Sequence, residues 1–476
     1  MAKNVLRMLF VFNLSCSVAL FIYGTLTSDD RFFVVSVGHI CLCSVLVFPV
    51  WTRSNVSYLE PYFFFVMYTL IGTLCTSYII AFHDSFRRDT IMNGYPVGFF
   101  ASQGVFLAVA LLLMGLGYVS CKSRIKIENY MPNEARFTHG GLHRAGLIVL
   151  ICSIASLVAF LQSTGGLDFS QLSKKRAIEV ASGGEIVYGN AAYLRLGVST
   201  SMSMLYVYIA YCMRTDGKIG PSGFLFSLPF FLTGAALPFL SSSRGDVAYS
   251  LIGLLVVYGA YKRVSVVSIG VLGLVAMSAF GLMTAMRFSD QQGTTEKFIN
   301  PIIALAESGN GLSLSGTTII MDGVPERLNY KLGTTYFTWL VAPIPRTVWL
   351  GKPEISLGKE IKTEIYGQKA VKSGRPPGVL GEGYINFGII GFLASAFVVG
   401  FLFRLVANSF LPVLTSNLIV IALYYPIILN LSALANNGVS QIIVRLLSDA
   451  IPVFLLIFAA QIFSRRGRGS VSNAKL

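Results

Sequence analysis

Residues 264–286 read VSVVSIGVLGLVAMSAFGLMTAM, and residues 287–298, which follow directly, read RFSDQQGTTEKF. The first stretch is apolar and about as long as the 20 residues that a helix needs to cross a bilayer. The second opens a mostly polar segment, 287–383, which carries eleven lysines and arginines. Further apolar stretches precede and follow this segment. The alternation predicts a protein of many membrane-spanning helices with one large loop outside the membrane.

The composition of the chain agrees with a membrane location. Of its 476 residues, 54% are hydrophobic and 12% are charged, and the mean hydropathy is +0.67. Soluble domains carry about 25% charged residues. The net charge of +15 would suggest a nucleic-acid partner for a soluble protein. Here much of that charge lies in the loops between apolar segments, without a basic face interleaved with aromatic residues, so we expect no nucleic-acid partner.

The apolar segments predict an all-α polytopic fold of about twelve transmembrane helices. Helices one to nine would occupy residues 1–286, the large loop residues 287–383, and helices ten to twelve, with a basic tail, residues 384–476. The predicted spans are 4–27, 33–51, 61–83, 99–119, 144–163, 192–212, 223–240, 247–261, 264–286, 384–406, 415–433 and 446–464.

The distribution of lysine and arginine predicts the orientation of these helices. With the N-terminus inside, seventeen of these cations fall in inner segments and nine fall in short outer loops. Inner loops of membrane proteins carry the excess of positive charge, whereas long loops are translocated largely regardless of charge. We therefore expect both termini in the cytoplasm and the segment 287–383 outside.

Two arginines near the ends of predicted spans are candidates for anion binding. Arg195 lies just inside the sixth span, and Arg244 lies between the seventh and eighth. A charge within or at the rim of a span usually faces a cavity, and a guanidinium can bind phosphate through two hydrogen bonds. The alternatives are an ion pair of Arg244 with Asp246 and an Arg195 side chain that extends to the lipid headgroups.

The large loop adds further candidates. Three prolines in residues 343–353 would hold Arg346 and Lys352 rigidly, which favours a site for an oxyanion or phosphate. The alternative is a structural turn with solvated charges. Glu382, between two glycines, is either a general base for an acceptor hydroxyl or part of a salt bridge. Residues 334–348 are too short to span, and we expect them to lie at the membrane surface.

The sequence gives no indication of a metal or cofactor site. The four histidines are scattered, and none lies in the large loop. The seven cysteines lie mostly in apolar segments without metal or redox spacing. No nucleotide-binding loop or serine-hydrolase motif is present. We predict neither a metal nor a cofactor.

Three motifs and the layout of the chain resemble the bacterial O-antigen polymerases, which join lipid-linked glycans. The resemblance implies a metal-independent, GT-C-like glycosyltransferase of the bacterial inner (cytoplasmic) membrane with its active site facing the periplasm. Its donor and acceptor would be undecaprenyl-diphosphate-linked glycans, and a polysaccharide chain-length regulator would be a possible partner. The motifs are Ser-Arg-Gly at 243–245, Ile344-Pro345-Arg346 with Trp349 and Lys352-Pro353, and Gly-Glu-Gly-Tyr-Ile-Asn-Phe-Gly-Ile-Ile-Gly at 381–391.

The positions of individual residues, taken with this resemblance, predict their roles. Arg244 and Arg346 would stabilise the departing diphosphate, and Glu382 would be the catalytic base. Arg195 would support the diphosphate site. Arg176, in a run of three cations, would help to attract the carrier, although a solvated charge run is the simpler interpretation. The remaining substrate-binding candidates are Arg287, Lys352, Arg375 and Tyr384.

Two other functions fit the layout less well. An O-antigen ligase has a similar arrangement of spans but depends on a histidine in the outer loop, and residues 287–383 contain none. A lipid-linked oligosaccharide flippase, or another secondary transporter, also fits twelve spans. Transporters are often built from inverted repeats, and no such repeat is evident in this sequence.

Overall fold

The computed structural model describes residues 2–53, 57–82, 95–130, 139–164, 194–240, 244–262, 264, 313–344, 348–367 and 374–472. Every regular element in these ranges is a helix. Ten of the helices are long and apolar enough to cross a membrane. The described part of the chain is therefore that of an all-α polytopic membrane protein.

Ten of the twelve predicted spans correspond to these ten helices. The predicted eighth span lies in α11 (Arg244–Tyr261), whose apolar part, Tyr249–Tyr261, is shorter than a full span. The predicted ninth span, 264–286, lies almost wholly outside the described residues. The number of twelve spans therefore stays a prediction.

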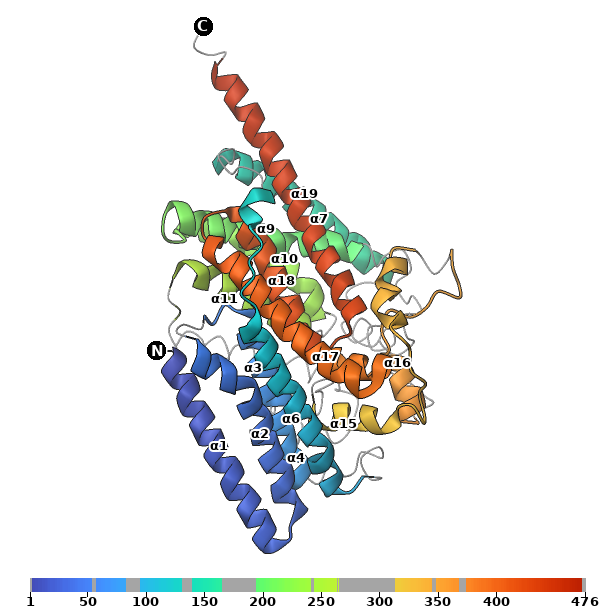
Figure 1. Cartoon of the computed structure of the whole chain (residues 1–476). Helices are drawn as coiled ribbons and strands as arrows, with labels where there is room; N and C mark the ends of the chain where they lie inside the picture. Colours follow the sequence, from blue (N-terminus) through green and yellow to red (C-terminus); the bar gives the residue numbers. More distant parts are fainter. Residues whose placement is uncertain are drawn as a thin grey trace, which may run out of the picture.

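The N-terminal third of the chain forms one layer of helices. Within it, α2 packs against α1, α3, α4 and α6, and the second half of the chain joins at α6 through α17 (Gly378–Phe410). In Figure 1, α1 to α6 lie together at one side, with α17 crossing beside α6. The elements of this layer are α1 (Ala2–Thr27), α2 (Asp30–Thr52), α3 (Pro61–Thr69), η1 (Leu70–Cys75), α4 (Thr76–Phe82) and α6 (Val97–Ser120), and the buried residues of η7 (Ala433–Ala435) belong to the same core.

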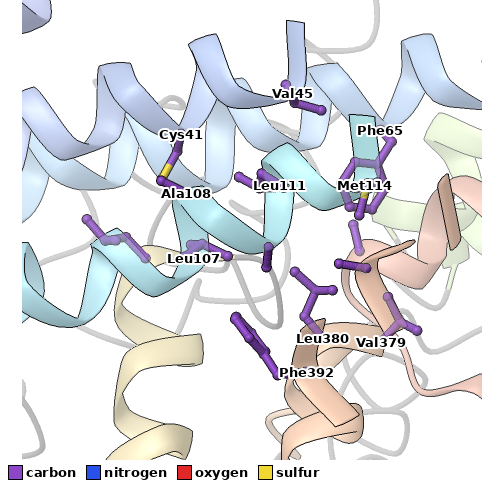
Figure 2. Packing of buried hydrophobic residues seen from close by; sticks show 14 of the residues in the cluster. Cys41, Val45, Phe65, Leu107, Ala108, Leu111, Met114, Val379, Leu380 and Phe392 are labelled. Carbon is purple, nitrogen blue, oxygen red and sulfur yellow. The ribbon is translucent and has the colours of Figure 1, made fainter. Parts of the chain in front are cut away.

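Fully buried apolar side chains hold this layer together. Leu107 and Leu111 of α6 have no exposed surface. They lie between Cys41 of α2 and Phe392 of α17 (Figure 2). By contrast, only 17% of the apolar window of α1 is buried, as expected for a helix that faces lipid. The most buried helix of this layer is α2, with 72% of its apolar window buried, and one face of α6 joins it to α17.

A second group of helices has its own core. Buried side chains of α9, such as Met204 and Tyr208, pack against α7, α10, α18 and α19. Figure 1 shows these helices gathered on the other side of α17. The elements are η2 (Ile127–Tyr130), α7 (His139–Thr164), α9 (Leu194–Thr215), α10 (Pro221–Leu240), α11 (Arg244–Tyr261), η6 (Leu411–Val413), α18 (Leu418–Ser432) and α19 (Val439–Ser472).

The described part of the predicted large loop packs onto the helices. Its first helix, α15 (Leu314–Gly323), is buried along almost its whole length against α6 and α17. It is followed by η4 (Thr334–Val341), α16 (Gly358–Glu360) and η5 (Ile361–Ile365). The segment 287–383 is thus partly built into the core.

The helix after the large loop begins six residues before its predicted start. The sequence predicts a span from residue 384, whereas α17 begins at Gly378, because Val379 and Leu380 are buried in the first core. The helix breaks at Phe387 and Gly388, and Gly388 has φ +62°, a conformation that glycine adopts without steric cost. The glycines of this motif therefore permit a sharp break in the helix.

The contact between α6 and α17 requires glycine. A Cβ atom on Gly400 would lie 2.0 Å from the carbonyl oxygen of Met114, and one on Gly117 would lie 2.1 Å from that of Phe397. Backbone atoms cannot move away as a flexible side chain can. Close helix contacts through small residues are typical of membrane proteins.

We expect Gly400→Ala to destabilise the protein by about 1–3 kcal/mol, the usual cost of overpacking. The matched control is Gly140→Ala on α7, where an added Cβ meets no atom within 4 Å. Thermal unfolding of the purified proteins in detergent would measure both. Equal unfolding midpoints for Gly400→Ala and the unaltered protein would contradict the close contact.

Candidate functional site: an arginine-lined cavity

The second group of helices lines an open cavity of about 700 Å³. Ligand pockets in proteins have volumes of about 300–1,000 Å³, so the space suits a ligand larger than a single ion. Its principal polar lining residues come from α9, α11, α18 and α19. They are Arg195, Ser199, Ser203, Tyr206, Tyr249, Ser250, Tyr425, Asn430, Gln441, Arg445 and Asp449.

Two arginines and one carboxylate provide the charges among the described lining residues. Arg195 is in the first turn of α9, and Arg445 and Asp449 are one turn apart on α19. The guanidinium carbon of Arg445 lies 5.3 Å from the centre of the Tyr249 ring, within the range of a cation–π interaction. The aromatic ring of α11 therefore helps to hold one cation at the cavity wall.

Polar groups of the cavity are already held in place by the protein. The side-chain amide of Asn430 donates to Asp449 Oδ2 at 2.6 Å. The hydroxyls of Ser203 and Tyr425 lie 3.0 Å apart. The Oε1 atom of Gln441 is buried and has no hydrogen-bond partner among the described residues. An unsatisfied acceptor in a cavity wall is suited to a hydroxyl donor from a ligand.

The cavity lies at the end of the helices that faces the large loop. Arg195 and Gln441 come from helix starts, and Asn430 comes from the end of α18. Ile355 and Ser356, which belong to the large loop, complete the lining. The loop therefore forms part of the cavity.

The predicted base, Glu382, lies in a separate buried network. Its side chain is 2% exposed, and its Oε2 accepts a hydrogen bond from the backbone N–H of Val439 at 2.6 Å. This contact satisfies a backbone donor at the start of α19. Glu382 does not line the cavity described above. Its catalytic role stays a prediction, and the described contacts are those of a structural carboxylate.

A neighbouring asparagine ties the large loop to α17. Asn386 is fully buried, and its Oδ1 accepts from the backbone N–H of Gly333 at 2.8 Å. Its amide nitrogen donates to Thr335 Oγ1 at 2.7 Å, and Ser440 of α19 donates to the carbonyl of Thr335 at 2.5 Å. Burial also raises the pKa of the nearby Tyr336 phenol. The network fixes η4 between α17 and α19.

Three other predicted substrate-binding residues occupy structural positions in the loop and in α17. Lys352 is buried, and its Nζ donates to the carbonyls of Ala342 and Ile344, both at 2.8 Å. It thus stabilises the end of η4 in the way that a cation stabilises a helix C-terminus. The Arg375 guanidinium carbon lies 4.7 Å from the centre of the Tyr366 ring. The half-buried Tyr384 ring packs against Phe392.

The remaining predicted site residues fall wholly or partly outside the described part of the chain. Arg176, Arg287 and Arg346 lie outside the described residues. Arg244 is the first residue of α11, and its side chain is not described. Tyr249 lines the cavity about one and a half turns further along the same helix. Of the nine predicted residues, Arg195 is the one whose described side chain lines this cavity.

The sequence analysis did not select Arg445 and Asp449 as site residues. A signal for both was present in the sequence, because ionisable residues within an apolar span usually face a cavity and mark a functional site. Asp449 lies inside the last predicted span, 446–464, and Arg445 directly precedes this span. Asn430 near the end of the preceding apolar segment is a second signal of this kind.

Comparisons with known proteins do not identify a family for the chain. No family model, curated protein or solved structure matches it. Within the described residues, no group of histidine, cysteine, aspartate and glutamate side chains is arranged to hold a metal ion. The fold and the cavity define the class as a multi-pass helical membrane protein with a polar, arginine-lined cavity.

Proposed function

We propose that the protein is an inner-membrane glycosyltransferase that polymerises undecaprenyl-diphosphate-linked oligosaccharide repeat units into O-antigen or a related surface polysaccharide. The observation that carries the proposal is the cavity with Arg195 and Arg445, to whose lining the large loop contributes Ile355 and Ser356. A donor of this kind presents an anionic diphosphate at the membrane surface. The cavity offers guanidinium groups for the diphosphate and amide and hydroxyl groups for the sugars.

The reaction would transfer a glycan from one lipid carrier to another. A hydroxyl of the acceptor glycan attacks the anomeric carbon of the donor, and the bond from this carbon to the diphosphate oxygen breaks. Undecaprenyl diphosphate leaves with the electron pair, so negative charge grows on the leaving oxygen. Arg195 and Arg445 would stabilise this charge, with Arg244 and Arg346 as further predicted contacts. Preorganised donors of this kind act strongly where water is excluded.

A carboxylate in the cavity would receive the proton of the attacking hydroxyl. Asp449 lines the cavity and is oriented by the hydrogen bond from Asn430. Its position favours it over the deeply buried Glu382 as the base. The active site would face the periplasm, because the cavity lies at the end of the bundle that the large loop covers. A chain-length regulator would act on the polymer that leaves this side.

The product profile of a deletion strain tests this function. We expect loss of the protein to leave single repeat units attached to the lipopolysaccharide, while long polymer disappears. Loss of a ligase would instead leave no repeat unit attached, and loss of a flippase would leave lipid-linked units on the inner leaflet. Gel analysis of the lipopolysaccharide and of lipid-linked intermediates distinguishes the three results. Either of the last two would contradict the proposal.

A further inference from the structure

A second polar cavity lies at the other end of the helices, away from the described part of the large loop. It has a volume of about 670 Å³. It is formed where α2, α6 and α17 end. Its charged lining residues are Arg53, Glu60, Lys122, Arg124 and Arg404.

A buried carboxylate holds two guanidinium groups at this cavity. Glu60 is 2% exposed, and its two carboxylate oxygens accept from Arg53 Nη1 at 2.9 and 2.7 Å. Arg404 Nη1 lies 3.7 Å from the same carboxylate. The fully buried Tyr118 donates its hydroxyl hydrogen bond to Glu60. Removing any partner would leave charge uncompensated in the core, so this group is a fixed part of the fold.

The tyrosine ring fixes the direction of the two arginines. The guanidinium carbons of Arg53 and Arg404 lie 5.4 and 5.6 Å from the centre of the Tyr118 ring. Both side chains are partly exposed, at 18% and 21%. Each therefore has surface facing the cavity while the protein holds its position. Groups held in this way lose little conformational entropy when a ligand binds.

The charge of the lining favours an anion. Four cationic side chains, Arg53, Lys122, Arg124 and Arg404, face the cavity together with one carboxylate, Glu60, among the described lining residues. Arg124 is additionally paired with the exposed Glu128. Even with Glu128 counted, two carboxylates do not balance four cations, so the cavity attracts negative charge. Arginine and lysine together are the usual ligands of phosphate groups.

The position of the cavity suits an amphiphilic ligand. Trp51, next to the lining residue Thr52, is 57% exposed, and its ring carries the guanidinium of Arg7 at 5.4 Å. Exposed tryptophans of membrane proteins lie at the level of the lipid headgroups. Val119 and Leu411 add an apolar wall beside the cations. A ligand with a phosphate and a hydrocarbon part matches both surfaces.

We infer that this cavity binds the phosphate of an anionic phospholipid from the leaflet at that end of the helices. Basic pockets between transmembrane helices on the cytoplasmic side are known sites for anionic headgroups. The predicted orientation places this end in the cytoplasm, because Arg53, Lys122, Arg124 and Arg404 all belong to the positively charged inner segments. The bound lipid would contact the ends of α2, α6 and α17 at the same time. This inference is independent of the proposed glycosyl transfer.

Native mass spectrometry of the purified full-length protein tests the inference. The protein would be titrated with phosphatidylglycerol, with zwitterionic phosphatidylcholine and with inorganic phosphate. We expect preferential retention of phosphatidylglycerol. Lys122→Ala should weaken its binding by about fivefold, the effect of roughly 1 kcal/mol per cation near an anionic lipid. Lys122 is exposed, so the change should leave folding intact.

The matched control is Lys126→Ala, which removes the same charge from an exposed position four residues away that does not line the cavity. Its affinity for phosphatidylglycerol should equal that of the unaltered protein. Equal weakening by both variants would show a diffuse surface effect and overturn the site. Equal retention of phosphatidylglycerol and phosphatidylcholine would also overturn the site. Inorganic phosphate that displaces phosphatidylglycerol at similar concentration would assign the cavity to a soluble phosphate ligand instead of a lipid.

Discussion

Arg445→Ala should abolish long-chain polymer in a complemented deletion strain, with a loss of rate of about 100–1,000-fold. This is the usual effect of removing one preorganised donor from a site where charge develops in the transition state. Arg445 lines the cavity and is held over the Tyr249 ring. Arg195→Ala should have an effect of the same kind, because Arg195 is the second described cation of the cavity.

The lysine variant separates charge from geometry. Arg445→Lys keeps a positive charge but loses the planar fork that makes two parallel hydrogen bonds to phosphate. We therefore expect short polymer and a rate between those of the unaltered protein and Arg445→Ala. The control is Arg31→Ala, which removes an exposed arginine from the first turn of α2, where it pairs with Asp29. The Arg31→Ala variant should form polymer of normal length.

Polymer length would be read from lipopolysaccharide gels, and the amount of each variant in the membrane from a blot. The comparison is valid only at equal protein level. Normal long-chain polymer from both Arg445→Ala and Arg195→Ala would rule out this cavity as the site of transfer. If Arg195→Ala forms normal polymer and Arg445→Ala does not, the diphosphate site would consist of Arg445 on α19 and the predicted contacts of the large loop, without Arg195.

The sequence predicted the helices well because each membrane span is a local property. A run of about 20 apolar residues is sufficient to identify a span, and ten predicted spans correspond to helices of the structure. The end of the large loop was less predictable. Gly381, Glu382 and Gly383 read as loop residues, but tertiary contacts with α15 and α19 bury them inside α17.

The candidate site was harder to predict because it depends on which helices meet. Arg195 was found because its charge lies inside an apolar segment. Arg445 and Asp449 carry the same signal, yet only the packing of α19 against α9 and α18 places them across from Arg195. Lys352 illustrates the opposite case. Its rigid, proline-rich surroundings suggested a ligand site, whereas its ammonium group binds two backbone carbonyls.

The two candidate bases can be separated by amide substitutions. Asp449→Asn should lose polymer formation, because an amide cannot accept the proton of the acceptor hydroxyl. Glu382→Gln should keep much of it, because the glutamine oxygen can still accept the hydrogen bond from Val439. Both substitutions preserve the size of the side chain, so a difference between them reports the chemistry of the group.

The alanine variant of Glu382 tests its structural contact directly. Glu382→Ala removes the acceptor of the Val439 N–H, and an unsatisfied buried donor costs about 1–3 kcal/mol. We therefore expect a lower thermal unfolding midpoint and less protein in the membrane for Glu382→Ala, with a near-normal midpoint for Glu382→Gln. A Glu382→Gln protein with a normal midpoint, normal amount and no polymer would instead identify Glu382 as the base. In that case the Asp449→Asn variant should still form polymer, because the single proton of the acceptor hydroxyl needs only one base.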